Sequence, residues 1–354
     1  MKIGIKALLL AVAVGLLAGP TYAGAPSGPV TLGDYSGDGR IDVLVEGSEL
    51  LYVYVTDGTG AAVDAAESAT IALPPAGFSV MAVADFNGDD HADTLVSDGT
   101  TMYVYITDAT TAAGAPIAVD GAASGAYGAV PSGWSIVGAA DANGDGNADV
   151  YLQNDSSGEL YTYITAAGGV SLDWQASGSP VTVPAGWTIT SIGDYNGDGR
   201  SDVLVTDAAG TAYTWTTNAD GISFAASPAS GSPIGIPAPW TWGGGGDYTS
   251  GTASSDLAIQ NAGNGYVYVF ATNADGVTVD AGASGLNVGS NGAGFSVQGI
   301  GDFNADGIAD TLLGNAGGLL YVFLNQNATT IDGGGLVTTV PVGDGFSVPV
   351  NPGF

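Results

Sequence analysis

The sequence contains no cysteine, which excludes a disulfide framework and a lipid-bearing N-terminal cysteine. A chain that needs cross-links but has no disulfides must obtain them from another source. Bound metal ions are such a source, because they stabilise only the folded state. The missing cysteines therefore point towards metal.

Basic residues are almost absent. The 354 residues include four Lys and Arg against 35 Asp and Glu, a formal net charge of −31. Nucleic acids and anionic membranes are bound through patches of Lys and Arg, so we expect neither as a partner. The chain is not a disordered acidic one, because 45% of its residues are hydrophobic and tyrosines recur regularly. We therefore expect the carboxylates to be neutralised locally.

Residues 1–23 are predicted to be a signal peptide. Lys2 and Lys6 precede or begin an apolar run from Ala7 to Leu17, and a cleavage site with small residues ends at Ala23. The run is too short to span a bilayer comfortably, and no second run of spanning length follows. We expect the mature chain, residues 24–354, to be secreted, extracellular or on the cell surface, with no membrane span.

A nine-residue motif, Asp-x-Asn-x-Asp-Gly-x-x-Asp, recurs along the chain. Its copies begin at Asp34, Asp85, Asp141, Asp194 and Asp302. A sixth copy, Asp247–Asp256, keeps only its two end residues and is one residue longer. The starting positions lie 51 to 56 residues apart, and repeats of this length are typical of solenoids and propellers.

The segments between the motifs also repeat. Each motif is followed by a short apolar run, a strand with alternating aromatics such as Tyr52 and Tyr54, and a Gly/Ala/Ser-rich segment. The last segment before the next motif is a strand that begins with a large aromatic residue. These leading residues, which we expect in the core, are Phe78, Trp134, Trp187, Trp240 and Phe295. Alternating aromatics are typical of a strand with one buried face.

Four short strands per repeat, with no helical periodicity, predict an all-β fold. We expect a single domain, residues 24–354, that is a six-bladed β-propeller of four-stranded blades. Residues 345–348 (Gly-Phe-Ser-Val) match 77–80, whereas residues 30–33 match the second half of that same strand type. We therefore expect the N- and C-terminal strand segments to close the ring, which removes free sheet edges.

The motif offers only oxygen ligands. Positions 1, 3, 5 and 9 supply side-chain oxygens, position 7 supplies a backbone carbonyl, and the glycine at position 6 permits a tight turn. Calcium prefers six to eight such ligands, whereas zinc would require His or Cys. Without a cation the crowded aspartates would repel one another, so we expect about five Ca²⁺ sites with a structural role. The predicted ligand positions are Asp34, Ser36, Asp38, Arg40 and Asp42; Asp85, Asn87, Asp89, His91 and Asp93; Asp141, Asn143, Asp145, Asn147 and Asp149; Asp194, Asn196, Asp198, Arg200 and Asp202; and Asp302, Asn304, Asp306, Ile308 and Asp310.

These loops resemble those of the FG-GAP/VCBS repeat family, the calcium-bearing propeller blades of integrin α-chains and many bacterial surface proteins. The resemblance implies a propeller used for extracellular recognition or adhesion, with calcium at the blade edges. Three residues depart from the pattern: Ser36 is a poorer ligand than Asn, Asp90 must accept the backbone angle of a glycine, and Ala305 replaces a glycine at small cost. We expect the sites that begin at Asp141 and Asp194 to be the tightest and the Asp247–Asp256 loop to be free of metal.

No catalytic constellation is evident. His91 is the only histidine, it occupies a loop position where a side chain is exposed, and no partner for proton transfer accompanies it. We therefore expect a non-catalytic module that binds an extracellular glycan or protein. Trp174 stands outside the aromatic registers and is a candidate for stacking on a sugar ring, although packing at the rim would also explain it. Two alternatives are a self-assembling surface or filament subunit and a polysaccharide-active enzyme such as a propeller lyase.

Overall fold

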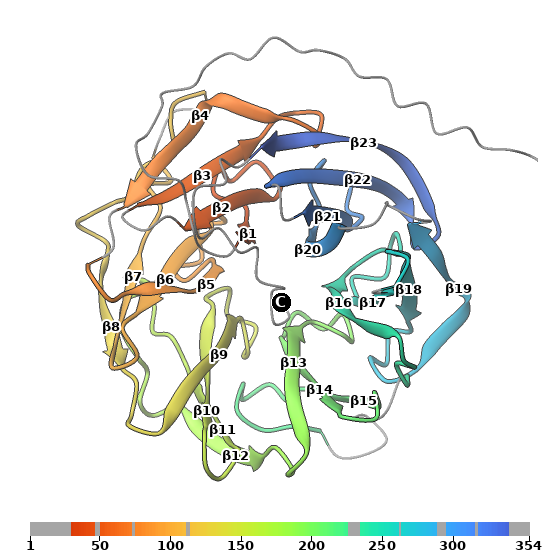
Figure 1. The fold of residues 1–354 in the computed structure, drawn as a ribbon. Coiled ribbons are helices and arrows are strands. Elements are labelled where there is room, and N and C mark those ends of the chain that lie inside the picture. The colour runs from red at the N-terminus through yellow and green to blue at the C-terminus, as the bar shows by residue number, and fades with distance from the viewer. Residues whose placement is uncertain are drawn as a thin grey trace, which may run out of the picture.

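The structure is a computed structural model that describes residues 30–46, 50–72, 75–110, 114–225, 234–261, 263–288, 295–315 and 318–339. The predicted signal peptide and the predicted C-terminal closing segment, residues 345–348, lie outside these ranges. Within these ranges, twenty-three strands form six antiparallel sheets in a ring (Figure 1). The predicted all-β, six-bladed propeller is confirmed.

Each blade is a run of consecutive strands, ordered from the centre outwards. Blades 1 to 3 contain β1 (Val30–Gly33), β2 (Asp42–Glu46), β3 (Leu51–Thr56) and β4 (Val63–Ala72); β5 (Ser79–Ala84), β6 (Asp93–Ser97), β7 (Thr101–Tyr105) and β8 (Gly125–Ala129); and β9 (Trp134–Ala140), β10 (Asp149–Asn154), β11 (Glu159–Tyr163) and β12 (Gly178–Thr182). Blades 4 to 6 contain β13 (Trp187–Gly193), β14 (Asp202–Asp207) and β15 (Ala212–Trp215); β16 (Trp240–Gly246), β17 (Asp256–Asn261), β18 (Val267–Thr272) and β19 (Val279–Val288); and β20 (Phe295–Gly301), β21 (Asp310–Asn315), β22 (Leu319–Asn327) and β23 (Thr330–Thr339).

Blade 4 has three strands in the part of the chain that is described, and the other five blades have four. Its fourth position is marked by backbone hydrogen bonds rather than by a strand. The N–H of Ala212 donates to the carbonyl of Ile234, and the N–H of Ile236 donates to that of Gly210. The outer edge of β15 is thus paired over a short length.

The boundaries of a blade and of a sequence repeat are offset by one strand. The strand with the leading aromatic, which ends each repeat in the sequence, is the innermost strand of the next blade. The reason is the hairpin that the motif forms: the residue before the motif pairs with its last aspartate, as Ala140 does with Asp149. The prediction that residues 30–33 form the second half of such a strand is confirmed, since β1 pairs with β2 from Val30↔Val45 to Gly33↔Asp42.

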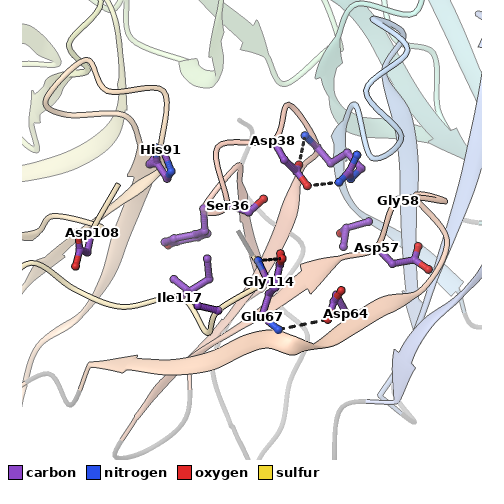
Figure 2. Close-up of a pocket in the computed structure, with 14 residues that line it drawn as sticks. Ser36, Asp38, Asp57, Gly58, Asp64, Glu67, His91, Asp108, Gly114 and Ile117 are labelled. Carbon is purple, nitrogen blue, oxygen red and sulfur yellow. Dashed lines mark hydrogen bonds and ion pairs between the residues drawn. The ribbon is translucent and has the colours of Figure 1, made fainter. Parts of the chain in front are cut away.

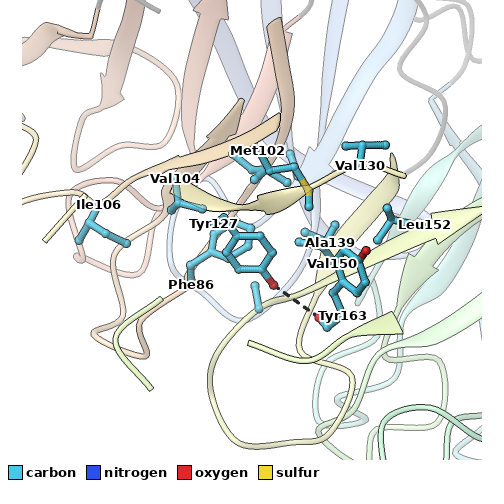
Figure 3. Close-up of a cluster of buried hydrophobic side chains, with 13 residues drawn as sticks. Phe86, Met102, Val104, Ile106, Tyr127, Val130, Ala139, Val150, Leu152 and Tyr163 are labelled. Atoms are coloured by element: carbon cyan, nitrogen blue, oxygen red, sulfur yellow. Dashed lines mark hydrogen bonds between the residues drawn. The ribbon is translucent and has the colours of Figure 1, made fainter. Parts of the chain in front are cut away.

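The hydrophobic core lies between the blades. The described residues form six buried clusters, and each cluster combines side chains of two neighbouring blades. Figure 3 shows the cluster of blades 2 and 3, in which Phe86 and Met102 of blade 2 pack against Val150 and Leu152 of blade 3. The cluster with Val43 and Phe303 joins blade 1 to blade 6 and so completes the ring.

The aromatic residues are less buried than the sequence predicted. In β3 the fully buried side chains are Leu51, Val53 and Val55, whereas Tyr52 and Tyr54 between them are only half-buried. The five aromatics that lead the innermost strands are partly buried, and four of them, Phe78, Trp134, Trp187 and Phe295, pack against the core clusters as predicted. Close packing between two sheets favours the compact aliphatic face, so the larger rings lie at its margin.

Candidate metal loops and an aromatic pocket

The six motif loops are the hairpin connections between the first and second strands of the blades. Within each complete loop the backbone wraps around the carboxylate of position 1. In the third loop, the N–H groups of Gly144 and Asp145 donate to Oδ1 of Asp141 at 2.7 and 3.2 Å, and that of Gly146 donates to Oδ2 at 2.8 Å. Gly144 and Gly146 have φ values of +78° and +88°, which glycine adopts without strain. The turn is therefore built by the aspartate and the two glycines together.

Positions 3 and 5 face each other in the same loops. The side-chain amide of Asn143 donates to Oδ2 of Asp145 at 3.0 Å, and the N–H of Asn147 donates to its Oδ1 at 2.9 Å. The other loops with Asn at position 3 have the same contact, at 2.9 to 3.1 Å. The position-5 carboxylate is thus held towards the inside of the loop.

The donor chemistry of these loops fits calcium. Three carboxylates, an amide and a carbonyl are the hard oxygen ligands that calcium prefers, and an oxygen that accepts one N–H keeps a second lone pair for a cation. As the side chains stand, the described residues include no group of three or more Asp, Glu or His side chains arranged to hold a metal ion. The five predicted calcium sites therefore remain a prediction.

The last aspartate, position 9, is a buried structural residue in all six loops. Its Oδ2 accepts the N–H of position 2, and its Oδ1 accepts an N–H in the last residues of the third strand or within two residues after it. For Asp93 these donors are Phe86, at 2.9 Å, and Thr107, at 2.7 Å. The third-strand donors in the six blades are Thr56, Thr107, Thr165, Thr217, Thr272 and Asn325.

The same third-strand residue also bonds the loop through its side chain. The hydroxyl of each threonine, or the amide of Asn325, donates to the backbone carbonyl of position 8 at 2.5 to 2.8 Å. We call this residue the latch. Sequence analysis missed it, although the signal was present: a Thr or Asn lies 14 to 16 residues after each final aspartate, directly behind the alternating aromatics.

Burial perturbs the position-9 carboxyl groups. It raises the pKa of Asp42 to about 8, and that of Asp93, Asp149, Asp202 and Asp310 to about 7. The carboxylates at positions 1 and 5 raise it further, whereas the backbone N–H groups oppose the shift. A cation beside these groups would favour their ionised form.

Position 8 joins each loop to the preceding one. Its backbone N–H donates to the carbonyl of position 1 in the preceding blade, at 2.5 to 2.8 Å. The six pairs are Ile41 to Asp302, Ala92 to Asp34, Ala148 to Asp85, Ser201 to Asp141, Ser255 to Asp194 and Ala309 to Asp247. The loops thus form a closed circle of hydrogen bonds in which the first loop bonds the last.

Position 7 contacts the preceding loop. The side chain of His91 lies against Gly37, and that of Arg200 lies against Gly144. His91 is therefore largely covered, with 19% of its side chain exposed, which corrects the expectation of an exposed residue. Arg40 and Arg200 also pair with the position-5 carboxylates Asp38 and Asp198 of their own loops. Both arginines of the sequence are thus engaged within the ring of loops.

The three departures from the motif have structural consequences. Asp90 has a φ of +67°, as its place at a glycine position predicted. Ala305 has a φ of +59°, so its replacement of glycine costs more than expected, because an L-residue pays about 1–2 kcal/mol there. In the degenerate loop, Thr249 and Thr252 donate hydroxyl protons to Asp256 and Asp247 at 2.9 and 3.1 Å. Two threonine hydroxyls thus donate to the carboxylates at both ends of that loop.

A pocket of about 250 Å³ opens beside the first loop, at the junction of blades 1 and 2 (Figure 2). It is lined by Ser36, Asp38 and His91 together with acidic residues of the outer strands and turns. One of these, Glu67, accepts the N–H of Gly114 at 2.7 Å. Because five of its lining residues, Tyr35, Ser36, Asp38, Arg40 and His91, are motif positions, this pocket is part of the ring of loops.

A second pocket, of about 230 Å³, lies in blade 3 and contains no motif residue. It is lined by Pro131, Trp134, Leu152, Tyr161, Tyr163 and Trp174. Trp174 is 65% exposed, so it does not pack as a buried rim residue. Its ring stands edge to face with Tyr163, at 5.5 Å between centroids and 72° between planes. We call this the blade-3 pocket.

Trp174 is peculiar to its blade. It follows Asp173, whose Oδ1 accepts the N–H of Gln175 at 2.9 Å and so forms a tight turn. Blades 1, 2 and 5 have the same turn, with the same aspartate hydrogen bond. The residue that corresponds to Trp174 is Ala65, Gly121 or Ala281 in those turns. The exposed indole is therefore not required by the turn.

The fold and the recurring aspartate-rich loops define a β-propeller of repeated blades, and comparison with known proteins agrees. A family model described as FG-GAP-like repeat matches residues 34–96 and 141–205. Both stretches begin at the first aspartate of a motif. The chain therefore carries FG-GAP-like repeats, and the resemblance seen in its loops is confirmed.

No curated protein sequence matches the chain. Among solved structures, an Agrocybe aegerita lectin that recognises non-reducing terminal N-acetylglucosamine is 16% identical, with a TM-score of 0.52; the match covers 88% of this chain and 80% of the lectin. The BBS1N chain of a complex with ARL6DN is 11% identical over 87% of this chain and 94% of that chain, with a TM-score of 0.45. The Dos1 propeller is 11% identical over 88% and 72%, with a TM-score of 0.43. At these identities the lectin shows the fold alone. In the described part of the chain no helix is suited to crossing a membrane.

Proposed function

We propose that this protein is a secreted, calcium-stabilised β-propeller that binds carbohydrate in the blade-3 pocket and catalyses no reaction. The observation that carries the proposal is the exposed Trp174 in a pocket lined by four aromatic rings. Exposing a large indole to water is unfavourable, and the equivalent turns do without it. A ligand that covers the ring would account for its presence.

The pocket has the composition of a sugar site. Aromatic side chains offer flat apolar faces to the C–H face of a pyranose, with polar atoms at their edges. Among the large hydrophobic residues that are described, only Trp174 and Leu286 are exposed. The Agrocybe aegerita lectin supports the proposal to the extent that a chain of this fold recognises a sugar.

Calcium has a structural role in this proposal. Extracellular calcium modules bind with dissociation constants of about 10⁻⁴ to 10⁻³ M, so each loop would gain roughly 0.4 to 1.4 kcal/mol at millimolar calcium. No motif residue lines the blade-3 pocket, so calcium would stabilise the ring and not contact the sugar. Sugar binding should then depend on calcium only as far as folding does.

A glycan array tests the proposal. The protein, purified from the culture medium, is applied in millimolar calcium and again in chelator, with folding followed by circular dichroism. We expect binding to a defined glycan in calcium. A folded protein that binds no glycan would contradict the proposed function, and a product that stays inside the cell would contradict secretion.

Trp174→Ala is the decisive variant. It installs the residue found in the same turn of blades 1 and 5, so the fold should be unaffected. We expect glycan affinity to fall about tenfold or more, since buried aromatic anchors dominate such interfaces. Leu286→Ala, at the other exposed large hydrophobic residue, is the matched control and should bind normally. Equal losses in both variants would exclude the blade-3 pocket as the site.

A further inference from the structure

We propose that the sugar bound in the blade-3 pocket carries a protonated amine, as a de-N-acetylated amino sugar does. This inference rests on the proposed function and adds the charge of the ligand. It is drawn from the arrangement of the rings, the charges around them and the lack of basic residues.

The rings of the pocket stand almost at right angles to one another. Trp134 and Tyr161 are 6.2 Å apart with planes at 90°, Tyr161 and Tyr163 are 5.4 Å apart at 78°, and Tyr163 and Trp174 are 5.5 Å apart at 72°. A stack of parallel rings would offer one flat platform. In this edge-to-face arrangement the open ring is that of Trp174, which is 65% exposed, and the face of an indole attracts a cation more strongly than that of Tyr or Phe.

The charges nearest to the pocket in the chain are negative. Asp173 directly precedes Trp174 and is exposed, and its carboxylate accepts N–H groups of its own turn. Asp155, also exposed, accepts the hydroxyl proton of Ser135, the residue after Trp134, at 2.8 Å. Carboxylates attract a cation and repel an anion, and this effect reaches about one Debye length.

Among the described residues, no positive charge is available for an acidic sugar. Neither Arg40 nor Arg200 lines the pocket, and both pair with aspartates of their own loops. The net charge of −31 repels polyanions from the whole molecule. A uronic or sialic acid would therefore be disfavoured, a neutral sugar tolerated and an amino sugar favoured.

The test compares oligosaccharides of positive, neutral and negative charge. Chito-oligosaccharide hexamers, fully N-acetylated or fully de-acetylated, are titrated by calorimetry at mildly acidic pH in millimolar calcium; an oligogalacturonate serves as the anionic ligand. We expect the de-acetylated hexamer to bind about tenfold more tightly than the N-acetylated one at low salt, with a smaller advantage at high salt. The anion should not bind.

Two variants separate a specific site from adsorption onto an acidic surface. Trp174→Ala should abolish the binding of the de-acetylated hexamer. Asp173→Asn keeps an oxygen that can accept the two turn N–H groups. It should lower the affinity for the de-acetylated hexamer several-fold and leave the affinity for the N-acetylated hexamer unchanged. If Trp174→Ala binds the de-acetylated hexamer normally, its binding is adsorption and the inference is wrong.

The outcomes also distinguish the inference from the proposed function. Equal or tighter binding of the N-acetylated hexamer, or binding of the oligogalacturonate, would overturn the positive charge of the ligand but leave carbohydrate recognition standing. Failure of every glycan, on the array and in calorimetry, would overturn both.

Discussion

The final aspartate of each motif has two possible roles, as a hydrogen-bond acceptor that holds the hairpin and as a calcium ligand. The degenerate loop distinguishes the two. Asp256 keeps both backbone hydrogen bonds and the latch contact, although its loop has lost positions 3 and 5. The hydrogen bonds alone are thus sufficient reason for an aspartate at this position. In the other five loops the same residue would serve calcium as well as the latch.

The latch hydrogen bond predicts how much stability is lost when a single hydroxyl group is removed. Thr107→Val keeps the shape of a buried side chain but leaves the carbonyl of Ala92 without its donor, which now lies at 2.6 Å. We expect a loss of about 1–2 kcal/mol in the free energy of unfolding, measured by urea denaturation. Thr101→Val, at an exposed position of β7, is the control and should change stability by less than about 0.5 kcal/mol. Equal effects would show that the latch bond contributes nothing.

At the level of the element, the turn after the third strand packs on the loop of the preceding blade. A Cβ at Gly169 would lie 3.0 Å from Cβ of Asn87, at position 3 of the second loop, and a Cβ at Gly221 would lie 2.9 Å from that of Asn143. These glycines also have φ values of +78° and +68°. Close approach and backbone angle thus both require glycine.

Two adjacent glycines separate these effects. Gly168 has a φ of +97° and open space where a Cβ would lie, whereas Gly169 has the close contact as well. Gly168→Ala should cost about 1–2 kcal/mol from the backbone alone. Gly169→Ala should cost a further 1–3 kcal/mol or so from overpacking against the second loop. The comparison is made by thermal and urea unfolding, and equal losses would refute the contact between turn and loop.

The elements were predictable where their pattern is local. The motif hairpins, the strand count per repeat and the unusual Trp174 can all be recognised within one repeat of the sequence. The latch was missed although its Thr or Asn recurs 14 to 16 residues after each final aspartate. The position-8 bonds could not be predicted, because they use backbone groups that every residue carries and join residues of different blades. The half-buried aromatics were misjudged because burial is set by the neighbouring blade.

At the scale of the whole molecule, the buried carboxyl groups predict how stability depends on pH. Their pKa values, about 7 to 8 in the five complete loops, lie above the value of about 4 in an unfolded chain. The folded state therefore binds protons more tightly. The stability that these protonated groups contribute to the folded state is fully present below about pH 4 and is lost as the pH rises through 7 to 8.

In chelator we therefore expect the melting temperature to fall between about pH 5 and pH 8. Millimolar calcium should raise it at pH 8 and remove most of this fall, because the cation stabilises the ionised carboxylates. Differential scanning fluorimetry at several pH values measures both effects. A melting temperature that rises with pH in chelator, or that ignores calcium at pH 8, would contradict the structural role of calcium.

The bond that closes the circle of loops joins Ile41 to Asp302, residues 261 positions apart in the chain. Every other bond in the circle joins neighbouring blades that follow one another in sequence. During synthesis the first blade must therefore wait, with one side of its core uncovered, until the sixth has been made. Folding of this protein should be slow to finish and vulnerable to truncation near its C-terminal end, since a ring that lacks its last blade exposes two apolar surfaces at once.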